Sequence, residues 1–274
     1  PATLEEALAL LSDRGGATCI LAGGTDVMVR MKRGLIGPER TTLLSVHRIP
    51  GLRGVQQDDG ELVVGAATTA TDLLRNPLIA ERAPILARVA DRVASAQIRN
   101  LATIGGNLAN ASPAGDLINP LLLLDATLVL ASGSGRRGVP VADFFTGPGE
   151  TVRRPDELLV EVRFEVPAPQ REFRFEKAGT RPAMECSVVT VGVAWTPRDG
   201  RFRDVRVAFG SSAPVPLRGR ETERLLEGEP IDRDTVEPAA RAAESEVSPI
   251  SDIRGSEAYR RVLAGLFLRR LLDG

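Results

Sequence analysis

Two pairs of adjacent glycines constrain this chain more than any other feature of its sequence. They lie in Ala22-Gly23-Gly24-Thr25-Asp26 and in Thr103-Ile104-Gly105-Gly106-Asn107. Glycine tolerates positive φ and lets the backbone approach a neighbour without a Cβ atom in between. Successive backbone N–H groups in such a turn can converge on an anion, and the hydroxyls of Thr25 and Thr103 can add donors beside them. We expect the Asp26 carboxylate to accept backbone N–H bonds and to hold the shape of its loop.

Either glycine pair alone is also typical of an ordinary tight turn. Neither pair belongs to a G-x-G-x-x-G fingerprint or to a P-loop, so the usual nucleotide motifs are missing. The wider sequence around the pairs therefore has to decide between a turn and an anion-binding site.

The bulk composition excludes several classes of protein. The 274 residues suit one large domain or two modest ones. A net charge of −1, from 35 basic and 36 acidic residues, is not the basic field of a nucleic-acid binder. No apolar run approaches the roughly 20 residues of a membrane span, and the start at Pro1-Ala2-Thr3 has neither the basic flank nor the apolar stretch of a signal peptide. We therefore expect a cytoplasmic protein.

The few cysteines and histidines argue against metal chemistry in this chain. Cys19 and Cys186 cannot supply the four ligands of an iron–sulfur cluster or of a cysteine-rich zinc site. Both have apolar neighbours, so we expect buried free thiols, with a disulfide as the alternative. His47 is the only histidine, and we expect it on the surface. Of the 35 basic residues only Lys32 and Lys177 are lysine; at Lys177 a need for a compact ammonium group is one explanation, and genome composition is the other.

The order of the predicted elements indicates an α+β fold. Thr3 and Glu6 form a capping box ahead of a first helix, and Pro84 introduces an amphipathic helix over 85–96. The segment 104–107 is predicted as a loop. Short strands are predicted at 19–21, where the strand is expected to be buried, and at 43–46, 62–65, 127–131 and 158–166, and a short helix at 120–124.

Pro167-Ala168-Pro169 is predicted to link two domains. We expect two packed lobes upstream, over residues 1–167, and a smaller α+β domain downstream, over residues 170–274. The downstream part shows strands at 173–176, 188–195 and 205–209, followed by helices at 216–226, 233–246 and 257–272.

Longer stretches of the sequence resemble a known family. Residues 21–26 and 102–116 are similar to the two flavin loops of the xanthine dehydrogenase family, also called the molybdenum hydroxylases, which includes the aerobic carbon monoxide dehydrogenases. Residues 65–69 with Asp72, residues 155–159 and residues 175–177 match further stretches in the order that the family has them. The resemblance covers nearly the whole chain and is specific in the long second loop.

The resemblance implies a FAD-binding domain of the vanillyl-alcohol-oxidase (PCMH) type, followed by a small C-terminal domain of the carbon monoxide dehydrogenase flavoprotein type. FAD would lie noncovalently between two lobes, with its diphosphate at the Gly-Gly loops. Asp116 would reach the ribityl or adenosine part, and Leu159 and Lys177 would lie near the isoalloxazine or the adenine. No catalytic residue and no metal ligand is carried over. The residues carried over as cofactor-binding are Ile20, Leu21, Ala22, Gly23, Gly24, Thr25, Asp26, Thr68, Thr103, Ile104, Gly105, Gly106, Asn107, Asn110, Asp116, Leu159 and Lys177.

For some of these residues a purely structural role is the alternative to cofactor binding. The polar residues of 110–116 are also typical turn formers. Leu159 stands in a strand, where packing in the core is the alternative. Lys177 would otherwise form a surface ion pair with Glu176 or Glu185.

The family resemblance also implies a function. The chain would be the FAD-binding, electron-transfer subunit of a molybdenum hydroxylase, similar to the carbon monoxide dehydrogenase medium subunit. A large subunit would hold molybdopterin, a small subunit would hold iron–sulfur clusters, and electrons would pass through FAD to an external acceptor. We expect a heterotrimer, doubled into a dimer of heterotrimers. The large subunit chooses the substrate, so carbon monoxide, purines, N-heterocycles and aldehydes all stay open.

Two other functions compete with this one. A self-contained flavin-dependent reductase of the same fold would need a proton donor, and the sequence shows no clear motif for one. A non-enzymatic nucleotide-binding module would use the Gly-Gly loops for phosphate alone or merely as turns.

Overall fold

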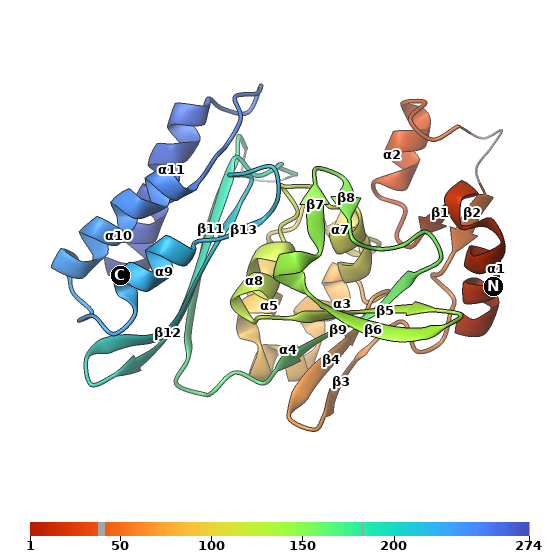
Figure 1. Ribbon diagram of the computed structural model, residues 1–274, viewed down its shortest axis with the longest axis horizontal. Coiled ribbons are helices and arrows are strands. Elements are labelled where there is room, and N and C mark those ends of the chain that lie inside the picture. The colour runs from red at the N-terminus through yellow and green to blue at the C-terminus, as the bar shows by residue number, and fades with distance from the viewer. Residues whose placement is uncertain (38–41, 182–183, 274) are drawn as a thin grey trace.

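The structure is a computed structural model that describes residues 1–37, 42–181 and 184–273. Two sheet-centred parts lie side by side, with the N-terminal helix at one end and a layer of C-terminal helices at the other (Figure 1). Within the described residues no helix is both long enough and apolar enough to cross a membrane.

The first part is built on a five-stranded antiparallel sheet in the order β3-β4-β9-β5-β6. A separate pair of parallel strands, β1 and β2, lies near the N-terminal helix α1. The elements of this part are α1 (Leu4–Arg14), η1 (Gly15–Ala17), β1 (Thr18–Leu21), α2 (Val27–Lys32), β2 (Thr42–Ser45), β3 (Val55–Asp58), β4 (Glu61–Gly65), α3 (Ala70–Arg75), α4 (Pro77–Arg82), α5 (Pro84–Asp91), α6 (Ala96–Arg99), α7 (Ile104–Ala109), α8 (Ile118–Leu123), β5 (Thr127–Ser132), β6 (Gly135–Pro140), η2 (Val141–Asp143), β7 (Phe145–Gly147), β8 (Glu150–Thr151) and β9 (Leu158–Glu165).

The five-stranded sheet is covered on both faces, which explains its apolar central strands. Along β9, Leu158 and Val160 pack into one core with α1 and β2, whereas Leu159 and Val162 pack into the opposite core with the helices α3, α4, α5, α7 and α8. Successive side chains of a strand point to opposite faces, so apolar residues follow one another where both faces are covered. Residues 158–160 are all apolar and buried for this reason, whereas Glu161 and Arg163 alternate with buried apolar residues further along β9. β9 therefore lies in the middle of three layers.

The second part is a four-stranded antiparallel sheet in the order β10-β11-β12-β13. One face is covered by the last three helices, which share a core with β11 and β12. The other face meets the first part: α8 packs on β11 and β12, and the buried side-chain amide of Asn119 donates to the Ala208 carbonyl at 2.9 Å. The elements are β10 (Glu172–Ala178), β11 (Val189–Arg198), β12 (Arg201–Gly210), β13 (Leu217–Arg218), α9 (Arg220–Leu226), α10 (Arg233–Glu246) and α11 (Glu257–Asp273).

Most of the predicted elements are present, but four expectations are wrong. The helix expected over 216–226 begins only at Arg220, because the chain first pairs with β12 as the strand β13 at Leu217–Arg218. The helix expected over 85–96 ends at Asp91, because Ala94 takes a positive φ of 41° before Ser95 caps α6. The strand at 19–21 is only half-buried. The segment 104–107 forms the start of helix α7 and is not a loop.

The thiols and the histidine complete this comparison. Cys19 and Cys186 are free, as expected, but they are not buried: Cys19 is half-buried and Cys186 is exposed. His47 is exposed, which confirms its surface position.

Candidate cofactor site

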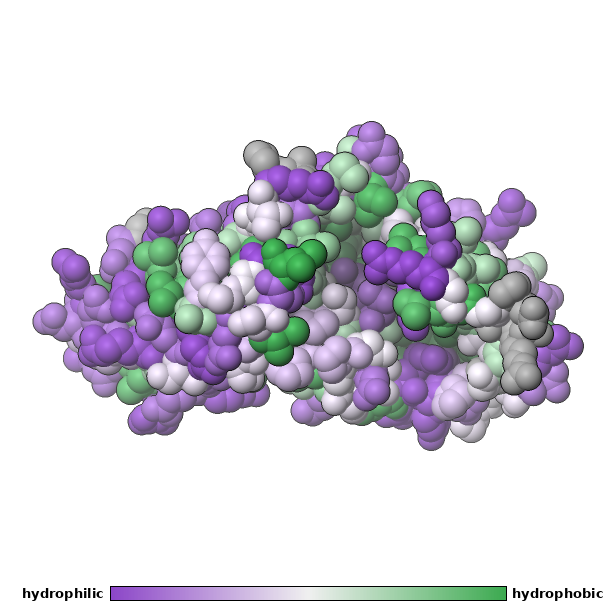
Figure 2. Space-filling view, turned by 90° about the horizontal axis from the view of Figure 1, so that it is seen from above, coloured by the Kyte–Doolittle hydropathy of each residue, from purple (hydrophilic) through white to green (hydrophobic). Residues whose placement is uncertain are grey.

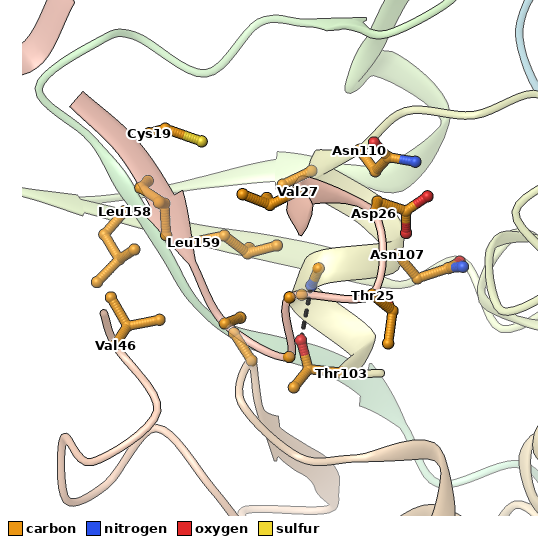
Figure 3. Close-up of a pocket in the computed structure, with 18 of the residues that line it drawn as sticks. Cys19, Thr25, Asp26, Val27, Val46, Thr103, Asn107, Asn110, Leu158 and Leu159 are labelled. Carbon is orange, nitrogen blue, oxygen red and sulfur yellow. Dashed lines mark hydrogen bonds between the residues drawn. The ribbon is translucent and has the colours of Figure 1, made fainter. Parts of the chain in front are cut away.

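An elongated cavity of about 570 Å³ brings the two glycine pairs together. It lies within the size range of about 300–1,000 Å³ that is usual for small-molecule and cofactor sites. Its walls come from β1 and the turn after it, the start of α7, and β9 (Figure 3). The face that carries α2 is hollowed towards its middle in the space-filling view (Figure 2).

The first glycine pair forms a turn between β1 and α2 that approaches the chain before the second pair. A Cβ atom on Gly23 would lie 1.8 Å from the Leu101 carbonyl oxygen, and Gly24 has a φ of +74°. Both positions therefore require glycine. In the part of the chain that the structure describes, the backbone N–H groups of Ala22 to Asp26 have no hydrogen-bond acceptor. The turn keeps its donors for a ligand.

The second glycine pair is built differently. Thr103 is the N-cap of α7, and its Oγ1 accepts a hydrogen bond from the Gly106 N–H at 3.0 Å (Figure 3). A Cβ on Gly105 would lie 2.7 Å from the Ala66 carbonyl oxygen, so glycine is needed for close backbone packing. The amides of this pair and of its neighbours are therefore already used inside the protein: Ile104 donates to Thr68, Gly105 to Ala66, Gly106 to Thr103 and Asn107 to Thr103.

The role expected for Asp26 is wrong. Asp26 precedes α2 as its N-cap, but its side chain accepts no capping hydrogen bond. The residue is exposed and lines the cavity beside Thr25 (Figure 3). The turn keeps its shape through Gly24 and through the Met28 N–H, which donates to the Gly24 carbonyl at 3.0 Å.

The cavity has a polar and an apolar part (Figure 3). Asn107 and Asn110 gather near Thr25, and Oδ1 of Asn107 is buried without a partner among the described residues. Leu158 and Leu159 line the other part together with Val46. Such an arrangement suits a ligand that has both a flat apolar ring and hydrogen-bonding groups.

Two arginines in the cavity wall were missed by sequence reasoning. Arg30 comes from α2, and Arg153 is fixed by bonds from its Nη1 to the carbonyls of Arg154 and Glu157, at 2.8 Å and 2.7 Å. Burial lowers the pKa of the Arg153 guanidinium, and nearby carboxylates partly oppose this. The sequence offers one indication of a site role for Arg153, namely its position just before residues 155–159, which resemble the family.

Cys19 is a third residue of the wall that sequence reasoning did not assign to it. Burial raises the pKa of its thiol, and the positive charges of Arg30 and Arg153 lower it in part. The guanidinium groups of Arg30 and Arg153 give the cavity a positive field near Cys19, and this field favours a ligand that carries phosphate charge.

The structure places most, but not all, of the predicted cofactor residues in this cavity wall. Outside it are Leu21, Thr68, Ile104, Asp116 and Lys177. In the lining are Ile20, Ala22, Gly23, Gly24, Thr25, Asp26, Thr103, Gly105, Gly106, Asn107, Asn110 and Leu159.

Leu21, in β1, is half-buried, and the other four residues outside the wall are buried for different reasons. Ile104 is part of the core, and the Thr68 hydroxyl bonds both the N–H and the carbonyl of Gly54, at 2.9 Å and 3.0 Å. Asp116 and Lys177 bond each other, with 2.7 Å between Oδ2 and Nζ. Direct contact of these residues with a cofactor stays a prediction.

Within the described residues, the first turn leaves its backbone amides without acceptors and Asn107 has an amide oxygen without a partner. Together with the two arginines and the apolar part of the wall, these groups fit a cofactor that carries a diphosphate and an aromatic ring. Free backbone donors were expected from both glycine pairs, but in the described part of the chain those of the second pair are used inside the protein.

Comparison with known proteins identifies the family. Residues 1–169 match the FAD binding domain in molybdopterin dehydrogenase, and residues 174–274 match the CO dehydrogenase flavoprotein C-terminal domain. The chain belongs to this family of FAD-binding subunits of molybdopterin dehydrogenases.

Similar proteins span almost the same length. The xanthine dehydrogenase FAD-binding subunit of Escherichia coli O157:H7 is 33% identical, over 99% of this chain and 93% of that protein. The carbon monoxide dehydrogenase medium chain of Hydrogenophaga pseudoflava is 32% identical, over 100% of this chain and 94% of that one. A solved structure of carbon monoxide dehydrogenase from the same organism superposes with a TM-score of 0.95, at 32% identity and the same coverage. The expected fold, a two-lobed FAD-binding part followed by a small C-terminal part, is confirmed.

Proposed function

We propose that this chain is the FAD-binding, electron-transfer subunit of a molybdenum hydroxylase complex. The observation that carries the proposal is the cavity in which the turn after β1, whose amides have no acceptor among the described residues, meets the start of α7. Membership of the family supports FAD as the occupant. Electrons would reach FAD from iron–sulfur clusters in a partner and leave to an external acceptor.

In this proposal each part of the cavity binds one part of a noncovalent FAD. The amides of Ala22 to Asp26 donate to the diphosphate, with Arg30 and Arg153 adding positive charge. Asn107 and Asn110 bind polar edges of the cofactor, and Leu159 packs against a ring. Five residues outside the cavity wall stay in the proposed set, either because they contact FAD or because they support residues that do: Leu21, Thr68, Ile104, Asp116 and Lys177.

The chemistry of the subunit would be supplied by the flavin, which accepts and donates electrons itself. The residues of this chain bind the cofactor, orient it and limit access of water along the apolar wall. We assign no catalytic acid or base. The proposed division into 1–167 and 170–274 places all cavity-lining residues in the first domain.

The proposed partners follow from what the similar proteins are called. They are medium chains or FAD-binding subunits, so a large subunit with molybdopterin and a small subunit with iron–sulfur clusters would complete the complex. We further propose a dimer of heterotrimers in the cytoplasm.

The test is a titration of the purified full-length chain with FAD. We expect one FAD per chain, with flavin absorption that persists through gel filtration. A colourless protein that cannot be loaded with FAD would contradict the proposal. Substrate turnover by the chain alone, without partner subunits, would instead support a self-contained reductase.

A further inference from the structure

Lys177 is one of only two lysines in a chain whose other basic residues are arginine, and its side chain is wholly buried. Its Nζ donates to Asp116 Oδ2 at 2.7 Å and to the Arg92 carbonyl at 3.0 Å. The Arg92 guanidinium donates back to the Lys177 carbonyl at 3.3 Å. An ammonium group is compact enough for this enclosed position, whereas a planar guanidinium needs more space.

Both oxygens of the Asp116 carboxylate are occupied by the second part of the molecule. Ser187 Oγ donates to Oδ1 at 2.6 Å, and Lys177 binds Oδ2. Nearby, the Ser211 N–H donates to the Pro113 carbonyl at 2.7 Å. The loop 111–116, which follows α7, is therefore held at two points by residues of the C-terminal part.

This loop bears directly on the polar part of the cavity. Gly115, next to Asp116, packs so closely on Asn107 that an added Cβ would lie 3.1 Å from Asn107 Oδ1. This Oδ1 atom is buried, and it has no hydrogen-bond partner among the described residues. A shift of Asp116 would therefore move the backbone against which Asn107 is packed.

We propose that Lys177 is a positioning residue for FAD binding, which acts through Asp116 by holding the loop 111–116 against Asn107. This inference rests on the proposed function, because FAD is the ligand whose binding it supports. Among the described residues, the Asp116 carboxylate without Lys177 keeps only the Ser187 hydroxyl as a close partner. A buried charge without its counter-ion is unfavourable, so the loop would rearrange to bring the carboxylate to water.

A second interdomain ion pair provides a matched control. At the other end of α8, buried Arg218 bonds the Asp125 carboxylate and the Leu122 carbonyl, and it lies outside the cavity wall. Replacing it with methionine breaks an ion pair between the same two parts of the molecule, in which Asp125 is half-exposed, and also removes the bond of Arg218 to Glu223. It leaves the loop 111–116 with all of its contacts.

The experiment is a double-mutant cycle on the full chain, with FAD itself as the probe. The variants are Lys177→Met, Asp116→Asn, the double variant, and Arg218→Met. The dissociation constant for FAD, the thermal midpoint and the visible circular dichroism of the bound flavin are measured for each. If Lys177 acts through Asp116, each single variant raises the dissociation constant for FAD by about tenfold or more. The dissociation constant of the double variant is then no higher than that of the single variant that binds FAD less tightly.

The flavin spectrum separates positioning from a general loss of stability. Lys177→Met and Asp116→Asn should change the circular dichroism of bound FAD in the same way. Arg218→Met should lower the thermal midpoint, whereas the spectrum of bound FAD and the affinity for FAD should equal those of the parent chain. The double variant removes the charges of Asp116 and Lys177 together and leaves Glu185, which lies 3.9 Å from Lys177 Nζ in the parent, so it is expected to fold even if a single variant does not.

Three results would overturn the inference. FAD affinity in Lys177→Met could equal that of the parent chain. The losses in the two single variants could multiply in the double variant, which would mean that Lys177 contacts FAD independently. Arg218→Met could weaken FAD binding as much as Lys177→Met does, which would reduce the role of Lys177 to docking of the two parts. Failure of the parent chain to bind FAD would instead refute the proposed function.

Discussion

Replacing Gly23 with alanine tests whether close contact between the two loops builds the cofactor site. The new Cβ would lie 1.8 Å from the Leu101 carbonyl oxygen and 2.6 Å from its carbonyl carbon. Ordinary van der Waals contact begins near 3.4 Å, so the two backbones must separate by about 1.6 Å. No side-chain rotation can relieve this clash, because both Leu101 atoms belong to the backbone.

The expected loss of affinity follows from that displacement. Overpacking costs about 1–3 kcal/mol in typical protein interiors. If the turn moves away from α7 to relieve the strain, FAD binding has to draw it back, and the upper end of that range corresponds to about 100-fold weaker binding. We therefore expect a large increase in the dissociation constant for FAD with Gly23→Ala.

The assay is a fluorescence titration of the apoprotein with FAD, with Gly133→Ala as the control. Gly133 lies outside the cavity wall, and a Cβ there would meet no atom of the described residues within 4 Å. The control should bind FAD like the parent chain. A folded Gly23→Ala protein with an affinity within about threefold of the parent would refute the idea that loop contact builds the site.

Three further predictions concern capping, pH and thiol access. Thr103→Ala should lower the free energy of unfolding by about 1 kcal/mol in urea titrations, because the Gly106 N–H loses its cap, while Thr103→Ser should not. Ion pairs and hydrogen bonds with two arginines hold the pKa of Asp252 far below its usual value, so this stabilisation is present above about pH 4 and is lost as the pH falls further. Asp252→Asn should therefore lower the thermal midpoint at pH 7, and the difference from the parent should shrink below about pH 4. With a thiol reagent, FAD should protect Cys19 in the cavity wall but not exposed Cys186; equal protection of both, or of neither, would contradict the cavity assignment.

Sequence periodicity was sufficient where one local pattern decides the structure. The alternating pattern at 158–166 predicted a strand, and β9 is there, and the helices 233–246 and 257–272 agree closely with α10 and α11. Periodicity failed at 104–107. Two adjacent glycines disfavour a helix, yet α7 begins at Ile104 because carbonyls of the chain at 66–68 accept its first amides. No local pattern reveals that interaction.

The candidate site was predictable in part for the same reason. The family-like stretches named Asn107, Asn110 and Leu159, and all three line the candidate cavity. The ion pair between Asp116 and Lys177 joins residues that are 61 positions apart, and it exists only because β10 lies against the loop after α7. The rarity of lysine indicated that Lys177 is special, but the structure was needed to identify its partner.

The two glycine pairs look alike in the sequence but have different roles in the structure. At the first pair, glycine brings the turn onto the backbone of Leu101 while its amides stay without acceptors among the described residues. At the second pair, glycine lets α7 begin against Ala66, and its amides are used up in holding that helix. Diphosphate binding by backbone donors would therefore belong to the first turn alone. The second pair contributes by fixing Asn107 and Asn110 at the opposite wall, and the C-terminal part stabilises that wall through Lys177 and the carboxylate that it holds.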